Sequence, residues 1–190
     1  SIPSPKAEPF KQWLAQVGYE RIQEIENPEL AQNRVKEYYE LKGYPKEWID
    51  KRIRGIAIRQ ELTDEWKECG ATKESDFAIL INEISKATFG KTVQEYKKFK
   101  NINIPNQNLR DHMGDWELIL TMIGEKATTD ITVAKDANGL PALKQTAKEG
   151  GDIAHNTRKE LEQKIGKPII SSENYLHLTA HRKRQIDKKK

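Results

Sequence analysis

With 190 residues, of which 36% are hydrophobic and 33% charged, the chain is long enough to bury a core without disulfides and reads as folded rather than disordered. Its longest apolar run is only a few residues, the N-terminal stretch lacks a signal-peptide pattern, and the single cysteine excludes an internal disulfide, so we expect a cytoplasmic protein without a membrane segment. The net charge of +4 is uneven: residues 182–190 contribute +5, and the remaining 181 residues sum to about −1.

Apolar residues recur at spacings of three and four along most of the chain, and strand-like alternation is hard to find. This pattern predicts an all-α, multi-helical protein with roughly seven to nine helices and no substantial sheet. The first helix is expected over residues 6–25, with a break near Gly18. Asn27 followed by Pro28 is typical of a helix start and predicts a second helix, which Gly43 ends.

Pro45 opens a third helix, whose apolar positions begin with Trp48 and Ile49. Its other face is rich in basic side chains, namely Lys51, Arg52, Arg54 and Arg59. Two interpretations stay open. The aliphatic stems of these residues could cover the flanks of the helix, or the charges could form a face that binds phosphates.

A triplet that ends phosphate-binding loops, Gly90-Lys91-Thr92, follows a helix that includes residues 77–84. A true loop of that kind needs a glycine where this chain has Ser85, and it follows a strand. Helix ends explain the triplet better, with Gly90 ending one helix and Thr92 forming a capping box with Glu95. We therefore expect a positive φ at Gly90, a bond from the Glu95 amide to the Thr92 hydroxyl, and no bound nucleotide.

The remaining pattern predicts a loop over residues 101–108 and then the clearest helix, from Leu109 through Ala127. The pair Gly150-Gly151 is expected to break the chain, so that Asp152 caps a new helix that stops at Gly166. A serine at position 171 or 172 is expected to cap a last helix, which runs into the basic tail.

No residue pattern indicates catalysis, a metal site or a cofactor. Of the four histidines, only His177 and His181 share a helical face, and no metalloprotease pattern surrounds them. Asp111, His112 and Asp115 are expected to cluster on one helix, but a carboxylate beside a histidine is common on helix surfaces and does not indicate a particular reaction. Cys69 is expected at a helix C-terminus, which raises the pKa of a thiol and favours an ordinary thiol over a nucleophile.

Two stretches resemble a known group of proteins. The segment from Ile2 to Arg59 is similar to the end of a Bro-N type prophage antirepressor segment and the helical region that follows it. From Glu61 onward the chain resembles the C-terminal part of DNA-damage-inducible protein D (DinD). The matching residues are Phe77 to Ile84, Phe89-Gly90 with Thr92, Ala127 to Thr129 with Ile131-Thr132, His155-Asn156 with Arg158 and Leu161, and Ser172 to Leu176.

This resemblance implies two parts, a helical segment over residues 1–62 that follows a Bro-N type domain, and a DinD-like helical domain over 63–190 with its basic tail at 182–190. It also implies a non-enzymatic regulator of the DNA-damage or prophage response that binds DNA, a recombinase such as RecA, or both. The residues expected to contact DNA phosphates are Arg182, Lys183, Arg184, Lys188, Lys189 and Lys190, followed by Lys51, Arg52, Arg54 and Arg59.

An alternative is a protein-interaction or oligomerisation domain that does not bind nucleic acid. In that case aromatic side chains would cover a partner or a second subunit, namely Trp13, Tyr38, Tyr39 and Trp48. A helix-turn-helix around residues 167–171 is a third hypothesis, although the loop there is longer than such motifs use.

Overall fold

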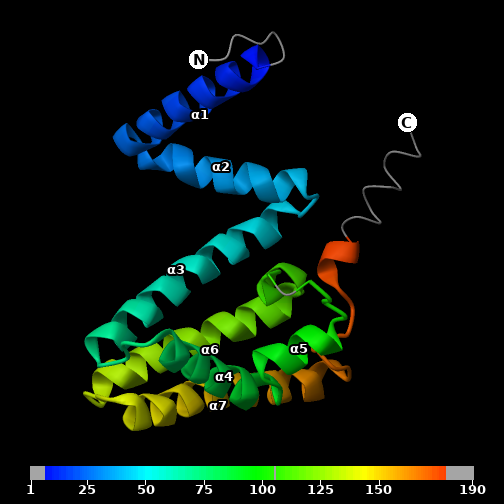
Figure 1. Cartoon of the computed structure of the whole chain (residues 1–190). Helices are drawn as coiled ribbons and strands as arrows, with labels where there is room; N and C mark the ends of the chain where they lie inside the picture. Colours follow the sequence, from blue (N-terminus) through cyan, green and yellow to red (C-terminus); the bar gives the residue numbers. More distant parts are fainter. Residues whose placement is uncertain (1–6, 105, 179–190) are drawn as a thin grey trace. The chain divides into compact units, whose positions relative to one another are not determined.

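The computed structural model describes residues 7–104 and 106–178, and every regular element in these ranges is helical (Figure 1). This confirms the predicted all-α class. The chain divides into two compact units, Ser1–Tyr44 and Pro45–Lys190, which we call unit 1 and unit 2. The boundary expected between residues 62 and 63 lies inside a continuous helix of unit 2.

Unit 1 consists of two helices, α1 (Glu8–Glu26) and α2 (Pro28–Leu41). The predicted start of α2 is confirmed, because the Asn27 side chain accepts a hydrogen bond from the Glu29 amide at 3.2 Å and Pro28 is the first helical residue. The predicted break near Gly18 is wrong, since α1 continues through it. One glycine costs about 1 kcal/mol relative to alanine, which is too little to end a helix.

One ion pair joins the two helices of unit 1. The Arg34 guanidinium bonds both carboxylate oxygens of Glu24, through Nε at 2.6 Å and Nη2 at 3.0 Å. This two-pronged geometry is the strongest form of a guanidinium–carboxylate pair. It holds the pKa of Glu24 below its ordinary value, chiefly through the hydrogen bond from Arg34.

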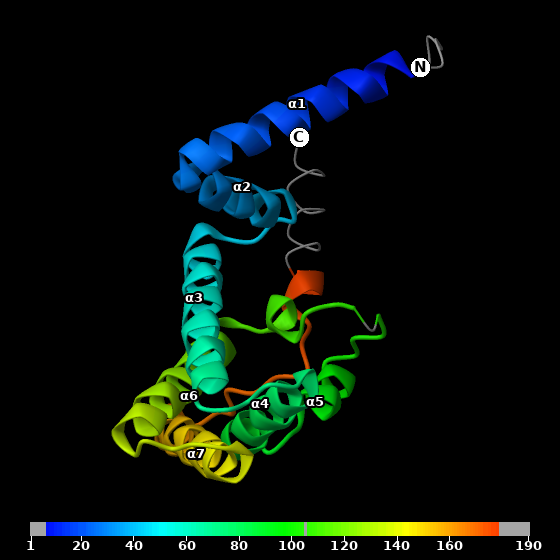
Figure 2. The ribbon, with the colours of Figure 1, turned by 60° about the vertical axis from the view of Figure 1, so that its left-hand side comes forward.

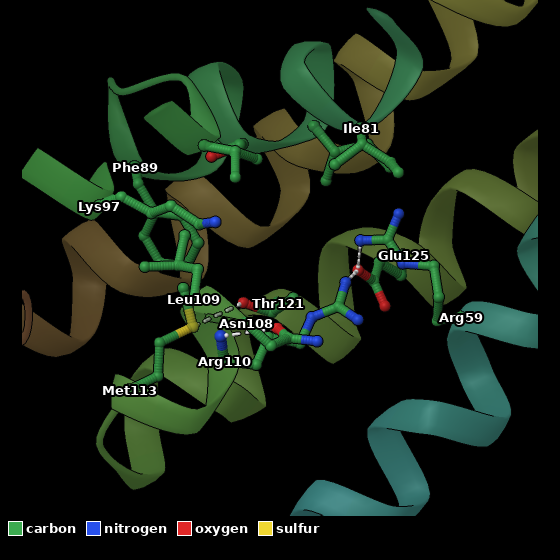
Figure 3. A pocket seen from close by; sticks show the side chains of 13 residues that line it. Arg59, Ile81, Phe89, Lys97, Asn108, Leu109, Arg110, Met113, Thr121 and Glu125 are labelled. Atoms are coloured by element: carbon green, nitrogen blue, oxygen red, sulfur yellow. Dashed lines mark hydrogen bonds and ion pairs between the residues drawn. The ribbon is translucent and has the colours of Figure 1, made fainter. Parts of the chain in front are cut away.

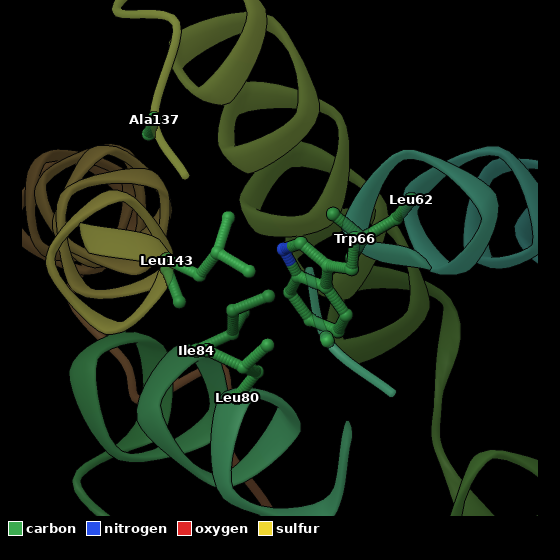
Figure 4. Packing of buried hydrophobic residues seen from close by; sticks show 8 residues of the cluster. Leu62, Trp66, Leu80, Ile84, Ala137 and Leu143 are labelled. Carbon is green, nitrogen blue, oxygen red and sulfur yellow. The ribbon is translucent and has the colours of Figure 1, made fainter. Parts of the chain in front are cut away.

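Unit 2 is built around α6 (Asp115–Ala134), which packs on α3 (Lys46–Glu68) and on α7 (Leu140–Ile165). The helix α4 (Glu74–Phe89) packs mainly on α7, and the short α5 (Val93–Phe99) follows it (Figure 2). The hydrophobic core lies where α3, α4 and α7 meet. Trp66 is fully buried there, against residues that include Leu62, Leu80, Ile84 and Leu143 (Figure 4).

The glycine pair in α7 is a contact point rather than a break. The helix runs unbroken through Gly150 and Gly151, so the predicted cap at Asp152 is wrong. A Cβ atom at Gly150 would lie 2.6 Å from the Thr128 amide nitrogen, and one at Gly151 would lie 2.5 Å from the Ala87 Cβ. The two glycines therefore let α7 approach α6 and α4 more closely than any side chain allows.

The predicted continuous helix from Leu109 is also wrong. A 3-10 turn, η1 (Leu109–His112), is followed by an extended residue, Met113, before α6 begins. Two hydrogen bonds fix this interruption. Trp48 Nε1 donates to the Met113 carbonyl at 3.0 Å, and the Glu117 carboxylate accepts from the Gly114 amide at 2.7 Å. The helical periodicity of the sequence passes through the interruption and hides it.

The segment after α7 lies beside the N-terminal end of α6. Gly166 ends α7 with a φ of 69°, as predicted. The helical residues 175–178 are capped by Asn174, whose Oδ1 accepts from the Leu176 amide at 3.1 Å. The predicted serine cap is therefore wrong, and Ser171 instead accepts a hydrogen bond from the Glu173 amide. Tyr175 stacks on Trp48 with the ring centroids 5.6 Å apart.

Candidate functional sites

The Gly-Lys-Thr triplet forms a junction between two helices, as predicted. Gly90 has a φ of 70°, the Thr92 hydroxyl accepts from the Glu95 amide at 3.2 Å, and the Glu95 carboxylate accepts from the Thr92 amide at 2.7 Å. The Lys91 ammonium lies over the Phe99 ring, 4.9 Å from its centroid. Each residue of the triplet thus has a local role at the helix junction.

The four basic residues of α3 have different surroundings. Arg52 is 4% exposed and donates to Asp111 at 2.9 Å, while Lys51 pairs with Asp115 at 2.9 Å. Arg59 is half-buried and pairs with Glu125, and Arg54 is exposed. They do not form one exposed basic face, because α3 packs against η1 and α6, which supply these carboxylates. Nucleic-acid binding by these four residues stays a prediction, and Arg54 is the most accessible of them.

Two guanidinium groups share one buried carboxylate at the end of a pocket in unit 2. Glu125 Oε1 accepts hydrogen bonds from both Arg59 and Arg110, and its side chain is 1% exposed (Figure 3). Burial lowers the pKa of Arg110 to about 10, partly opposed by the negative charge of Glu125. The pocket has a volume of about 340 Å³. Its other lining residues are Ile81, Ile84, Ser85, Phe89, Val93, Lys97, Asn108, Leu109, Met113 and Thr121.

A second buried polar cluster joins three separate segments of unit 2, namely α5 with the residue that ends it, α6, and the segment after α7. The Lys100 side chain is 0% exposed, and its ammonium pairs with Glu117 at 2.9 Å and donates to the carbonyls of Ser171 and Glu173, each at 2.9 Å. The Tyr96 hydroxyl also donates to Glu117. Burial, followed by the charge of Glu117, raises the pKa of Tyr96. The cluster satisfies its buried charges internally, which indicates a structural role.

Sequence reasoning missed both clusters, although α6 carries a signal. Glu117 and Glu125 are eight residues apart and therefore share a helical face with Thr121, Gly124 and Thr128, which face the interior. Carboxylates on the inward side of a helix require buried cationic partners. The pattern could thus have predicted buried ion pairs, but it could not have named Lys100 or Arg110 as the partners.

The histidines do not form a metal site in the residues that the structure describes. His112 is buried, and its Nδ1 lies 2.7 Å from Asn174 Oδ1. Asp111 and His112 belong to η1 and Asp115 begins α6, so their expected placement on one helix is wrong, and the two carboxylates pair with basic residues of α3. His177 is exposed, whereas His181 lies outside the described residues. In those same ranges no group of three metal-ligating side chains is found.

Cys69 stands at the C-terminus of α3, as predicted. Burial and a hydrogen bond from its thiol to the Glu65 carboxylate, at 3.3 Å, raise the pKa of Cys69 to about 11. The predicted direction is confirmed, with burial as the largest cause. A thiol with this pKa is almost entirely protonated at neutral pH and is a poor nucleophile.

Large apolar side chains are exposed along α1. The helix contains no buried residue, and Trp13 is 58% exposed with its ring stacked on Phe10 at 5.9 Å. The other exposed apolar residues of the helix are Leu14, Tyr19, Ile22 and Ile25. We call this set, including Phe10 and Trp13, the α1 apolar surface.

The four aromatic residues expected to cover a partner differ in how exposed they are. Trp13 and Tyr38 are exposed, as that hypothesis needs. Tyr39 is buried, with the Tyr44 ring edge-on to it at 5.6 Å. Trp48 is 1% exposed and belongs to the interior of unit 2, so it is wrong as a surface anchor. The Nε1 bond to Met113 explains why this tryptophan tolerates burial.

The six basic residues of the tail lie outside the described residues, so their predicted role in DNA binding is not tested by the structure. None of the helices in the described part of the chain is long and apolar enough to span a bilayer. No known protein-family model matches the chain, and no curated protein matches it at a significant level.

Residues that carry the resemblance to DinD lie largely in the packing of unit 2. Phe89, Thr128 and Thr132 are buried between helices, and Arg158 and Asn174 are buried as well. Buried positions of this kind bear on the fold and not on what the protein binds. Membership of the family therefore stays a prediction.

Proposed function

We propose that the chain is a non-enzymatic regulatory module of the DNA-damage or prophage response that binds a RecA-type recombinase, DNA, or both. The observation that supports it most is the α1 apolar surface, which exposes Trp13, Phe10 and Tyr19 on a helix without a buried residue. The resemblance to DinD supplies the class of partner, and the basic residues 182–190 supply a means of binding phosphates.

The helix α1 gains little stability from packing within the chain, because none of its residues is buried. Most helical stability in proteins comes from packing an apolar face and not from the helix propensity of the chain. Exposed aromatic residues are also the side chains that most often dominate the binding energy of protein interfaces. The α1 apolar surface is therefore suited to being covered by a protein partner, with Trp13, its largest side chain, as the main anchor.

DNA would contribute through charge rather than through base recognition. Residues 182–190 carry six Lys or Arg against one Asp, and exposed Arg54 of α3 adds to them. Neutralising roughly five phosphates gives a log–log dependence of affinity on salt with a slope of about −4. Binding that does not change with salt, or that survives deletion of residues 182–190, would contradict a role for the tail.

The direct experiment is a fluorescence anisotropy titration of the chain against labelled single- and double-stranded DNA, with and without RecA filaments, at several salt concentrations. Trp13→Ala should weaken binding to filaments by at least about thirtyfold, the threshold for an interface hot spot. The matched control is Trp116→Ala, which removes an exposed tryptophan from unit 2 and should leave binding unchanged. Equal effects of both variants would contradict the proposal.

A second function is supported by the same surface. If the α1 apolar surface covers another copy of the chain, the protein is an oligomerisation module without nucleic-acid binding of its own. The molecular mass would then rise with concentration, and Trp13→Ala would return it to that of a monomer. Sedimentation analysis over a wide concentration range separates the two functions, because a recombinase-binding module stays monomeric in the absence of filaments.

A further inference from the structure

The pocket of about 340 Å³ in unit 2 combines an apolar wall with a charged end. Figure 3 shows the guanidinium groups of Arg59 and Arg110 meeting at Glu125, while Lys97 extends into the pocket region from α5 on the opposite side. Ile81 and Phe89 of α4 and Met113 after η1 form apolar parts of the wall. Pockets of this size, largely apolar with a few convergent charges, are the usual form of a small-molecule site.

Charge at the pocket is not balanced by the residues that line it. Arg59 and Arg110 contribute two positive charges, and Glu125 contributes one negative charge. One oxygen of Glu125 accepts from both guanidinium groups, so this group of three residues has an excess of one positive charge. In surroundings of low dielectric such an excess attracts an anion more strongly than it would in water.

Some hydrogen-bonding groups at the charged end of the pocket, where Arg59 and Arg110 meet Glu125, have no hydrogen-bond partner. Arg59 Nε and Nη1 are buried without a hydrogen-bond partner, as is Glu125 Oε2. Buried donors of a charged group are costly to leave unpaired, and nearly all such groups in folded proteins have a partner. Two free donors and one free acceptor match a head group that is mainly an acceptor and carries at most one hydroxyl.

We propose that this pocket binds a small amphipathic anion, with a carboxylate, sulfonate or phosphate group at Arg59 and Arg110 and an apolar ring or chain against Ile81, Phe89 and Met113. The anion supplies the acceptors that Arg59 lacks and offsets the excess positive charge. The apolar body fills the remainder of the cavity. This site is separate from the α1 apolar surface, and it belongs to unit 2 alone.

The test uses 1-anilinonaphthalene-8-sulfonate, an aromatic sulfonate whose fluorescence rises on binding, and its uncharged counterpart N-phenyl-1-naphthylamine. Titration of the full chain should show one saturable site for the sulfonate, and binding of the uncharged compound should be weaker. Arg59→Gln should weaken sulfonate binding by about tenfold or more, the effect of losing a hydrogen bond to a charged group. It should leave the uncharged compound unaffected.

Two further variants keep the test decisive if Arg59→Gln does not fold. Lys97→Gln should weaken sulfonate binding by about threefold, as expected for one partly exposed charge. Lys98→Gln is the matched control, because Lys98 is exposed on the same helix and does not line the pocket. Ile81→Trp should fill the cavity and abolish binding of both compounds, with thermal unfolding confirming that the variant folds.

The exposed aromatic residues of unit 1 could also bind this probe, so Trp13→Ala belongs in the same series. If the site is the pocket, Trp13→Ala leaves the saturable signal unchanged. The proposal is overturned if the signal falls with Trp13→Ala but not with Lys97→Gln or Ile81→Trp. It is equally overturned if the sulfonate and the uncharged compound bind with the same affinity.

Discussion

Trp66 of unit 2 and Trp13 of unit 1 lie in opposite environments. In unit 2, Trp66 is 0% exposed in the core, whereas in unit 1, Trp13 is 58% exposed on a helix without a buried residue. Unit 2 also buries the ion pair of Lys100 with Glu117, while the pair of Arg34 with Glu24 that joins the helices of unit 1 is partly exposed. Unit 2 therefore has the buried interactions that stabilise a fold, and unit 1 presents exposed apolar side chains, which the proposed partner would cover.

The largest expected effect separates the two tryptophans. Trp66→Ala should lower the free energy of unfolding of unit 2 by about 4 kcal/mol, because it leaves a large cavity in the core. Trp13→Ala should change it by less than about 0.5 kcal/mol, as for other exposed positions. Denaturant titrations followed by circular dichroism measure both. Similar losses in the two variants would mean that unit 1 has a core of its own.

A buried lysine gives the next effect. Lys100→Met should cost unit 2 about 3 kcal/mol or more, because the buried carboxylate of Glu117 would lose its cation. The control is Lys98→Met on the same helix, where the side chain is exposed and the expected change is within about 0.5 kcal/mol. If methionine at position 100 proves neutral, the Lys100 cluster does not hold the C-terminal segment in place.

Replacing a helical glycine by alanine should change stability with opposite signs in the two units. Gly150→Ala should destabilise unit 2 by about 1–3 kcal/mol, because the added Cβ would lie 2.7 Å from the Gly124 carbonyl oxygen. Gly18→Ala should stabilise α1 by about 0.5–1 kcal/mol, since nothing lies within 4 Å of the new atom. Thermal unfolding and helix content report both. The same sign for both substitutions would contradict the packing described for α7.

The smallest effect concerns pH and the ion pair of unit 1. Because the folded-state pKa of Glu24 lies below its ordinary value of 4.5, its pair with Arg34 contributes stability above pH 4.5. That contribution is lost as the pH falls through the lowered pKa. Glu24→Gln should remove this acid-dependent part of the α1–α2 contact, which chemical shifts measured against pH detect. Glu37→Gln, on exposed α2 surface, should leave it intact.

Signals local to the chain were predictable from the sequence, and signals that depend on a distant partner were not. Asn27 and Thr92 cap helices through atoms two or three residues away, so their neighbours in the sequence suffice to identify them. The role of Gly150 depends on Thr128 of another helix, so the sequence alone predicts a helix break at this glycine. The two clusters follow the same rule, because nothing local distinguishes buried Lys100 from exposed Lys98.

The basic residues of α3 show the same limit at a candidate site. Their spacing on one helix was visible in the sequence, but their partners Asp111, Asp115 and Glu125 lie more than fifty residues further along the chain. Only the packing of α3 on α6 and η1 reveals that three of the four charges are paired. The pocket was unpredictable for this reason as well, since its lining comes from α3, α4, α5, η1 and α6.

The central proposal, that unit 1 binds a partner while unit 2 holds the stable core, is tested most directly by hydrogen exchange on the full chain with and without RecA filaments. Without filaments, the amides of α6 and α7 should exchange only by global unfolding, and those of α1 should exchange far faster. Adding filaments should slow exchange in α1 specifically. Exchange in α1 as slow as in α6 before any addition, or unchanged by filaments, would contradict the claim.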